Sequence, residues 1–135
     1  MNNCIFCKII SGEVQASKIY EDDKVLAFLD IKPLNPGHTL VVPKEHFDDL
    51  TSTPDELVCA VTRIAKMIGK KIIESKLGEG FNIGINTKKP AGQVVNHFHL
   101  HVMPRLSNDG YEHWKGKDYA AGEEKETILK LREEL

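Results

Sequence analysis

One stretch of the chain, residues 97–102, alternates polar and apolar side chains with period two, and each of its polar positions is a histidine. Such alternation predicts a half-buried β-strand whose apolar side chains face a core. Because successive side chains of a strand point to opposite faces, the imidazoles then share one face at intervals of about 7 Å. They belong to His97, His99 and His101. An ordinary solvated strand face does not need three imidazoles, so the pattern indicates a metal cluster, a nucleophile with helper groups, or both.

Length and composition narrow the class of protein. A chain of 135 residues that is 41% hydrophobic and 28% charged suits one globular domain with a core of its own. Its net charge of −2 provides no electrostatic attraction to nucleic acid or to an anionic membrane, so we expect neither as a partner. The first residues lack the basic region and apolar run of a signal peptide, and an odd number of cysteines, three, favours a reducing compartment. We therefore expect a cytoplasmic protein.

Short apolar runs and one long periodic segment predict the fold class. Strand patterns besides the histidine strand occupy residues 18–21, 25–30, 39–42 and 81–86. Thr53 followed by Pro54 is a typical helix start, and apolar residues at helical spacing continue this helix to residue 75. We expect a single α+β domain with an antiparallel sheet of about five strands, one long helix, a short N-terminal helix and a C-terminal helical tail.

The character of the chain changes after Arg105. Residues 1–105 carry the strand and helix patterns of the domain, whereas residues 106–135 are mostly polar and end in a charged helical pattern over residues 123–135. That last segment has a narrow apolar stripe, so we expect the extension to pack on the same domain.

Cys4 and Cys7 form a C-x-x-C at the very start of the chain. Three interpretations are open for it: a redox dithiol, half of a zinc site, or coincidence. A thioredoxin-like pair belongs between a strand and a helix of a βαβ unit, and almost nothing precedes these cysteines. The redox interpretation is therefore the weakest.

Three stretches of the chain, taken together, resemble the histidine triad (HIT) superfamily of nucleotide hydrolases and transferases. Residues 91–105 follow its H-x-H-x-H signature, and residues 28–31 and 37–46 are similar to its upstream landmarks in the same order. The resemblance covers roughly residues 4 to 105 and is greatest to the Hint-like bacterial branch that carries a zinc-binding C-x-x-C near its N-terminus.

The resemblance implies a reaction. His99, the middle histidine, would attack the α-phosphorus of a nucleoside 5′-phosphoramidate or related purine nucleotide and form a covalent nucleotidyl-histidine that water then cleaves. His101 would donate a hydrogen bond to the charge that develops on the phosphate. Two alternatives stay open. A dinucleoside polyphosphate hydrolase is favoured by the ending Pro104-Arg105, and a zinc-stabilised nucleotide-binding or interaction module with little turnover is consistent with Val94.

The resemblance also assigns substrate contacts. Asp30 would accept hydrogen bonds from the ribose hydroxyls, and Asn86 and Gln93 would offer amide donors to the phosphate. Gly92 would let the backbone approach the ligand closely. Family members often carry serine or threonine at the position of Val94, so a hydroxyl contact to the phosphate is missing here. Its loss weakens the interaction with the phosphate by roughly 1.5–3 kcal/mol. The expected nucleobase slot consists of Phe6, Ile9, Phe28 and Ile31.

A structural zinc ion and a homodimer complete what the resemblance implies. The zinc ligands would be two thiolates and two imidazoles, a set that suits tetrahedral Zn²⁺: Cys4, Cys7, His46 and His97. His38 is a rival for the fourth position, and its other possible role is to orient the triad. Family members pair so that their two sheets join, and we expect the long helix to help form that contact.

Overall fold

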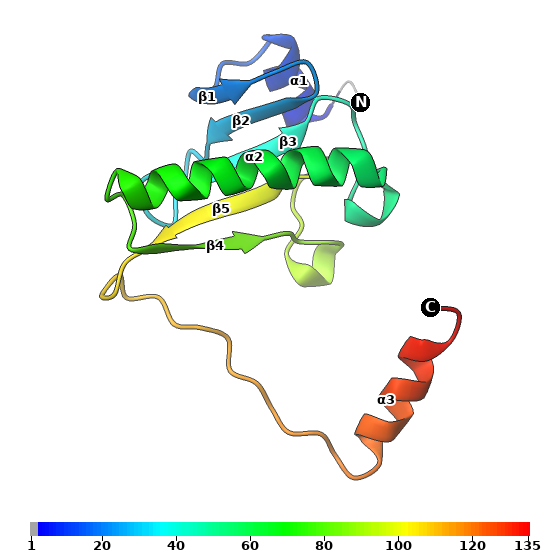
Figure 1. The fold of residues 1–135 in the computed structure, drawn as a ribbon. Helices are drawn as coiled ribbons and strands as arrows, with labels where there is room; N and C mark the ends of the chain where they lie inside the picture. Colours follow the sequence, from blue (N-terminus) through cyan, green and yellow to red (C-terminus); the bar gives the residue numbers. More distant parts are fainter. Residues whose placement is uncertain (1–2) are drawn as a thin grey trace.

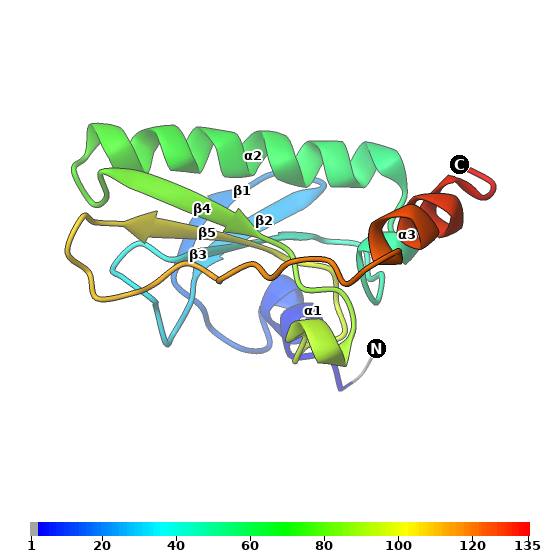
Figure 2. The same cartoon turned by 90° about the horizontal axis from the view of Figure 1, so that it is seen from below.

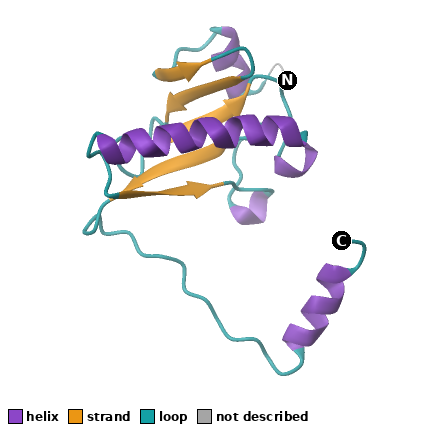
Figure 3. Ribbon diagram, in the orientation of Figure 1, coloured by secondary structure: helices purple, strands orange, loops and turns teal. Residues whose placement is uncertain are grey.

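The computed structural model describes residues 3–135, and one five-stranded antiparallel sheet organises them (Figures 1 and 3). The strand order across the sheet is β1-β2-β3-β5-β4, so β1 and β4 are the edge strands. The strands are β1 (Lys18–Glu21), β2 (Val25–Leu29), β3 (Thr39–Pro43), β4 (Gly80–Gly84) and β5 (Leu100–Arg105). The helices are α1 (Ile5–Ser11), α2 (Asp55–Glu74) and α3 (Glu123–Arg132), with short 3₁₀ turns η1 (Leu50–Ser52) and η2 (Lys89–Ala91). The expected α+β class and five antiparallel strands are confirmed.

Helices cover both faces of the sheet. The long helix α2 lies across one face, and the short helix α1 lies on the other, as the view from below makes plain (Figure 2). Strands β2 and β3 are therefore buried on both sides, which explains why their sequences read as continuous apolar runs rather than as alternating patterns. On the α2 side, Gly69 permits close packing, because a Cβ atom there would lie 2.3 Å from the ring of Phe81 on β4.

Two hydrophobic cores result, one on each face. The core under α2 contains the apolar side chains of the histidine strand together with Val41 and Ile64. The second core joins α1 to the other face through Phe6, Ile9 and Phe28. Phe98, Leu100 and Val102 lie in the first core, as the alternating pattern predicts. The histidines between them consequently lie toward the face that carries α1.

The ends of two elements differ from the sequence-based expectation. Strand β5 begins at Leu100 rather than at His97: the N–H of Phe98 donates to the carbonyl of Phe47, in the loop after β3, and the carbonyl of His97 accepts a hydrogen bond from the His99 ring. The long helix begins at Asp55, and Pro54 is its N-cap without a side-chain hydrogen bond. Thr53 does not cap it, because its hydroxyl donates to the carbonyl of Asp49.

The last 25 residues leave the domain as an arm, which we define as residues 111–135. The arm runs away from the end of β5, past the edge strand β4, and ends in α3 (Figure 1). Its first part, Tyr111 to Trp114, lines a hollow beside β4 and β5, but α3 buries none of its residues. Earlier residues of the extension also bond to the domain, Ser107 to Glu79 and Asp109 to Asn35, and packing of the rest of the extension on the same domain stays a prediction. No helix in the described part of the chain is long and apolar enough to span a membrane.

Candidate functional site

The imidazoles of the histidine strand divide into two neighbouring groups on one face of the sheet. His97 is fully buried and faces the N-terminal cysteines, whereas His99 and His101 continue along the strand with ring centroids 5.0 Å apart. The ring of Phe6, from α1, meets the ring of His99 edge-on at 5.0 Å. Helix α1 thus covers the point where the two groups meet.

The first group is a compact set of four metal-ligating side chains, Cys4, Cys7, His46 and His97, whose ligand atoms all lie within 4.8 Å of one another. The Nδ1 atom of His97 lies 3.5 Å from the sulfur of Cys4 and 3.6 Å from that of Cys7. The sulfur of Cys7 lies 3.3 Å from Nδ1 of His46. Zn–S and Zn–N bonds of about 2.3 and 2.05 Å at tetrahedral angles require S···N separations near 3.5 Å, so this cluster fits the ion.

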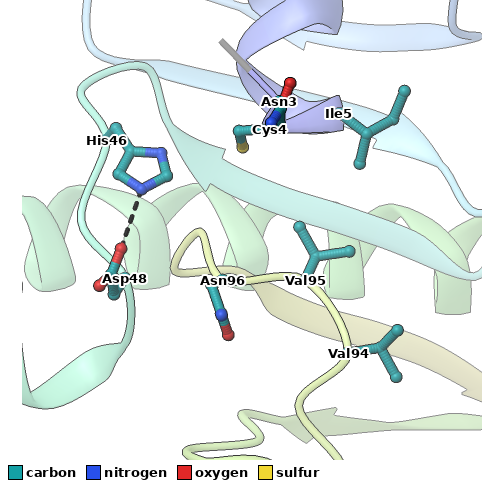
Figure 4. A pocket seen from close by; sticks show the side chains of 8 residues that line it. All are labelled: Asn3, Cys4, Ile5, His46, Asp48, Val94, Val95 and Asn96. Atoms are coloured by element: carbon teal, nitrogen blue, oxygen red, sulfur yellow. Dashed lines mark hydrogen bonds and ion pairs between the residues drawn. The ribbon is translucent and has the colours of Figure 1, made fainter. Parts of the chain in front are cut away.

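Hydrogen bonds at the outer ring nitrogens prepare both histidines of this cluster to bind a metal. The Nε2–H of His97 donates to the carbonyl of Pro43 at 2.8 Å, and that of His46 donates to the carboxylate of Asp48 at 3.0 Å (Figure 4). Each ring therefore presents an unprotonated Nδ1 to the cysteines. Burial lowers the pKa of His97 to about 4, which keeps it neutral at physiological pH.

The cysteines stand side by side because α1 begins between them. Cys4 is the N-cap of α1, and its sulfur accepts a hydrogen bond from the backbone N–H of Cys7. Burial, followed by the contact with Cys4, raises the pKa of the Cys7 thiol. Two adjacent thiols of this kind ionise together only when a cation neutralises them.

His38 does not belong to the cysteine cluster. Its Nδ1 accepts the backbone N–H of Leu34 at 2.9 Å, so a neutral His38 carries its proton on Nε2. That Nε2 lies 2.9 Å from Nδ1 of His101, to which it donates. The proton of a neutral His101 is consequently placed on its Nε2. His46, rather than its rival His38, completes the set of possible metal ligands.

The same tautomer argues against a metal ion at the other group of ligating side chains, Asp30, His38 and His101. Their ligand atoms also lie within 4.8 Å of one another. Both ring nitrogens of His38 are nevertheless engaged, one as an acceptor and one as a donor, so this ring has no lone pair to offer. Burial lowers the pKa of His38, and burial together with the neighbouring histidines lowers that of His101 to about 4.

His99 is oriented in the opposite sense from His97. Its Nδ1–H donates to the carbonyl of its neighbour His97 at 2.7 Å, which leaves the lone pair of Nε2 free. Burial lowers the pKa of His99, so the ring is neutral and nucleophilic at neutral pH. A backbone carbonyl on a rigid segment thus holds the proton on one nitrogen while the other can react.

A hollow of about 550 Å³ opens in front of His99 and His101. It collects almost all of the residues expected to contact substrate: Phe6, Ile9, Phe28, Asp30, Ile31, Asn86, Gly92 and Val94. Phe6 and Phe28 meet edge to face at 5.5 Å and form its apolar floor. Ile31 and Val94 stand at its rim, 93% and 90% exposed.

The polar residues of the hollow, Asp30 and Asn86, come from loops, and Asn86 lies beside a glycine with positive φ. Gly92 has φ +98°, a conformation that favours glycine, and a Cβ atom there would lie 3.4 Å from Nδ2 of Asn86. Asn86 in turn donates to the carbonyl of Gly92 at 3.4 Å. Asp30 accepts the backbone N–H of Lys32 and has its second oxygen 3.6 Å from Nε2 of His38. Its carboxylate is therefore held in place at the wall of the hollow.

Gln93 is the predicted contact that the structure does not bring to the hollow. Its amide nitrogen donates to the carbonyls of Asp48 and Val95, and its oxygen accepts the backbone N–H of Lys88. With every amide group used, Gln93 ties the glycine loop to the loop that carries the His46–Asp48 pair. In this structure the Gln93 amide shapes the loop, and its assignment as a phosphate donor stays a prediction.

Sequence reasoning missed the groups that orient the histidines. Two of them, the carbonyl of Pro43 and the N–H of Leu34, belong to the backbone and have no residue-type signal. Asp48 did have a signal in the sequence, because it is an acidic residue two positions after His46. Arg105 has a structural role: its guanidinium donates to Asp109 and Asn82 and so is not free to bind a phosphate.

Comparisons with known proteins agree on one family. The model of that family, described as "HIT domain", matches residues 11–108. An uncharacterised HIT-like protein of Methanocaldococcus jannaschii is 51% identical over 110 residues, which span 79% of this chain and 82% of that protein. The adenylylsulfatase HINT3 of Arabidopsis thaliana is 42% identical over 108 residues, 80% of this chain and 55% of that protein.

Solved structures extend the likeness. The crystal structure of a HIT family protein from Bacillus anthracis superposes on 99% of this chain and 98% of its own, with a TM-score of 0.87 and 37% sequence identity. A Zn-bound histidine triad family protein from Mycobacterium smegmatis covers 96% of this chain and 92% of its own, with a TM-score of 0.79 and 41% identity.

Proposed function

Because the chain belongs to the HIT domain family, we propose that it is a nucleotide hydrolase that acts at the α-phosphorus of a nucleoside 5′-phosphoramidate or a related purine nucleotide. The observation that carries this proposal is the orientation of His99. Its Nδ1–H is held by the carbonyl of His97, and its free Nε2 belongs to the wall of the hollow. A buried, neutral imidazole with a fixed tautomer has the properties of a phosphoryl nucleophile.

The reaction has two displacement steps. In the first, Nε2 of His99 bonds to the α-phosphorus while the bond to the leaving amine or oxygen breaks, and the leaving group takes up a proton. In the second, a water oxygen bonds to phosphorus, the N–P bond breaks, and the nucleoside monophosphate is released with the water's proton transferred to solvent or to a neighbouring base. The carbonyl of His97 accepts the Nδ1–H in both steps and so stabilises the positive charge on the ring.

His101 supports the developing charge on the phosphate. Its proton is on Nε2 because Nδ1 accepts from His38, which in turn accepts the backbone N–H of Leu34. This chain of hydrogen bonds delivers one N–H donor beside the reacting phosphorus without requiring a protonated imidazole. Donors fixed in advance where charge develops are the largest contribution to many enzymatic rates.

The hollow suits a purine nucleoside. Asp30 would accept from the ribose hydroxyls, and the apolar surfaces of Phe6, Phe28 and Ile31 would hold the base. These surfaces offer stacking and apolar contact rather than a hydrogen-bonding pattern specific to one purine. Loose base preference follows from that composition.

We further propose zinc as the ion of the cluster formed by Cys4, Cys7, His46 and His97. The relative from Mycobacterium smegmatis is Zn-bound, which supports the choice. Four protein ligands fill a tetrahedral shell, so the ion's contribution is structural. It would clasp α1 to the segment whose carbonyl at His97 holds His99. Thiolate ligands persist in a reducing compartment, which fits a cytoplasmic location.

A homodimer is the proposed assembly. Members of this family commonly pair, and the edge strand β4 has no neighbour on its outer side among the described residues. Pairing of two such edges would continue the sheet from one copy into the other. Light scattering at micromolar concentration would give twice the chain mass, whereas the mass of one chain would contradict the proposal.

One substrate panel tests the proposed activity against its alternatives. Adenosine 5′-phosphoramidate, a diadenosine polyphosphate and adenylyl sulfate would be offered under identical conditions; the last is included because a relative is named an adenylylsulfatase. Fastest release of AMP from the phosphoramidate supports the proposal, and preference for diadenosine polyphosphates supports the dinucleoside alternative. Nucleotide binding without turnover of any of the three would indicate a zinc-stabilised binding module, the reading consistent with Val94.

A further inference from the structure

We propose that Lys88 is a positioning residue for the substrate hollow. Its side chain and its backbone hydrogen bonds hold the loop of residues 86–93 in a strained shape, and that shape presents Asn86 and Gly92 to the nucleotide. The inference rests on the proposed function, because it concerns how the phosphate of that nucleotide is held. It adds a residue that does not itself line the hollow.

The backbone of Lys88 has a conformation that is ordinarily restricted to glycine. Its φ is +74° and its ψ is +159°. A Cβ atom clashes with the backbone in this region, so residues other than glycine adopt it only under strain. Such strain persists only where the surrounding contacts fix it, and it is concentrated at binding and catalytic sites. Lys88 agrees with that distribution, because it lies in the chain between two residues expected to contact substrate, Asn86 and Gly92.

The N–H and the carbonyl of Lys88 are both fixed by hydrogen bonds within the loop. The N–H donates to the side-chain oxygen of Gln93 at 2.9 Å. The carbonyl accepts the backbone N–H groups of Ala91 at 3.1 Å and of Gln93 at 3.2 Å. A change of φ or ψ at Lys88 toward an ordinary value would turn one of these groups away from its partner. The strained conformation and the closed shape of the loop therefore depend on each other.

The side chain of Lys88 adds an anchor outside the loop. Its ammonium group lies 2.7 Å from a carboxylate oxygen of Asp49, whose side chain is only 5% exposed. The other oxygen of Asp49 accepts the hydroxyl of Thr51 and the N–H of Ser52, which keep this carboxylate in place. The lysine holds the pKa of Asp49 well below its usual range, so the carboxylate stays charged. The ion pair thus offsets part of the strain and ties the loop to the segment before α2.

The shape of the loop determines where its two ends lie at the hollow. The side-chain amide of Asn86 donates to the carbonyl of Gly92 at 3.4 Å, which joins these ends. If Lys88 relaxed, both residues would occupy their present positions in only a fraction of the molecules. The apparent affinity for a ligand falls in proportion to that fraction. Relaxation of the loop should consequently raise KM more than it lowers kcat, because bound substrate selects the closed loop.

Two substitutions at this one position separate the backbone from the side chain. Lys88→Ala and Lys88→Gly both leave Asp49 without its lysine, but only alanine has the Cβ atom that opposes the observed conformation. Lys88→Gly should keep kcat/KM toward adenosine 5′-phosphoramidate within about threefold of the wild type. Lys88→Ala should lose about tenfold or more, mainly through KM. The dissociation constant for AMP, measured by titration calorimetry, should change by the same factors.

Melting temperatures test the strain itself without reference to activity. At an unstrained position the glycine variant is the less stable of the two, because glycine has more freedom in the unfolded chain. Lys89, whose φ is not positive, provides this control, and Lys89→Gly should melt below Lys89→Ala. At position 88 the order should be reversed, with Lys88→Gly melting about 3 °C or more above Lys88→Ala.

The outcomes are distinct from one another. Lys88→Gly melting below Lys88→Ala, as expected at position 89, would overturn the strained conformation. Equal losses of kcat/KM and of AMP affinity in both Lys88 variants would overturn the positioning role, because the lysine side chain itself would then be what the nucleotide requires. A wild type that binds AMP but turns over no member of the substrate panel would overturn the proposed hydrolase, and the AMP affinities of the two variants would then decide the role of Lys88.

Discussion

The proposed metal cluster and the proposed catalytic group use the same side chain, histidine, on the same face of the sheet, and they differ in which ring nitrogen is left free. At His97 the Nε2–H is held by a backbone carbonyl, and Nδ1 faces two sulfurs. At His99 the Nδ1–H is held by a backbone carbonyl, and Nε2 is free at the substrate hollow. The role proposed for each imidazole therefore depends on which ring nitrogen its hydrogen-bond partner occupies.

The two groups are also coupled through one peptide unit. The carbonyl that holds His99 belongs to His97, whose ring is one of the proposed metal ligands. Fixing the ring of His97 thus fixes the acceptor on which the tautomer of His99 depends. We expect changes to the first group to alter stability most and changes to the second to alter rate most. Four predictions test this division, in order of decreasing effect.

The largest expected effect is on turnover in His99→Ala. The variant should lose at least about a thousandfold in kcat toward adenosine 5′-phosphoramidate, because no other side chain can take the place of the nucleophile. Its melting temperature should stay close to that of the wild type, since His99 belongs to the proposed catalytic group and not to the metal cluster. Steady-state kinetics and calorimetry measure the two quantities. His113→Ala, in the exposed arm, is the matched control, and near-normal turnover in His99→Ala would refute the assignment.

The next effect is the reverse, a loss of stability in Cys7→Ala or Cys4→Ala. Each variant removes one of four ligands, so the bound metal and the clasp on α1 should be lost together. A fall in melting temperature of about 10 °C or more is expected for a domain of this size. Elemental analysis and calorimetry of protein purified without chelator provide the check. Cys59→Ala should leave both unchanged, and a wild-type protein that is fully stable without stoichiometric zinc would defeat the structural role.

A smaller effect concerns pH. The pKa of His101 in the folded chain is about 4, against about 6.5 in an unfolded chain. Between these values the unfolded state binds a proton that the folded state does not, so stability falls as the pH falls through this window. From pH 7 to pH 5 the expected contribution is roughly 1 to 2 kcal/mol. Urea denaturation at both pH values should show a smaller loss in His101→Asn than in His113→Asn, and equal losses would contradict the prediction.

The smallest effect is expected at Val94, on the rim of the hollow. Val94→Ser supplies the hydroxyl that many family members have, and it should raise kcat/KM by about tenfold through a hydrogen bond to the phosphate, the lower end of the range for such a bond, because this position is 90% exposed. Val94→Ala removes the same bulk without adding a donor and serves as its control. If kcat/KM rose equally in both variants, the smaller side chain and not the hydrogen bond would be the cause.

Much of this architecture could be predicted from the sequence, for identifiable reasons. The alternation around Phe98 and the helical spacing of α2 could be read because burial requires apolar side chains at regular intervals along a strand or a helix. The cysteine–histidine cluster was reached through family resemblance, because Cys4 and His97 are too far apart in the chain for spacing to join them. The first residue of strand β5 was not predicted correctly, because the carbonyl of His97 accepts from a ring of the same segment. The alternation of polar and apolar residues carries no information on such a bond.

The remaining differences have the same origin. The resemblance assigned Gln93 to the phosphate, and the backbone partners of its amide in neighbouring loops could not be foreseen from the sequence. For the arm, an apolar stripe indicates that a helix packs but not on which surface, and α3 buries none of its residues among the described ones. Tertiary hydrogen bonds and packing between copies depend on positions in space, and a single sequence does not encode them in a local pattern.

Rapid quenching followed by peptide mass spectrometry would detect the proposed covalent bond between His99 and the α-phosphorus. The enzyme would be mixed with excess adenosine 5′-phosphoramidate, quenched in base within milliseconds to preserve a phosphoramidate bond, and digested. We expect a nucleotidyl group on the peptide that contains His99; it should accumulate during the first turnover and be absent from His99→Ala. A wild-type enzyme that turns over at its normal rate without that adduct, or with the adduct on a different residue, would contradict it.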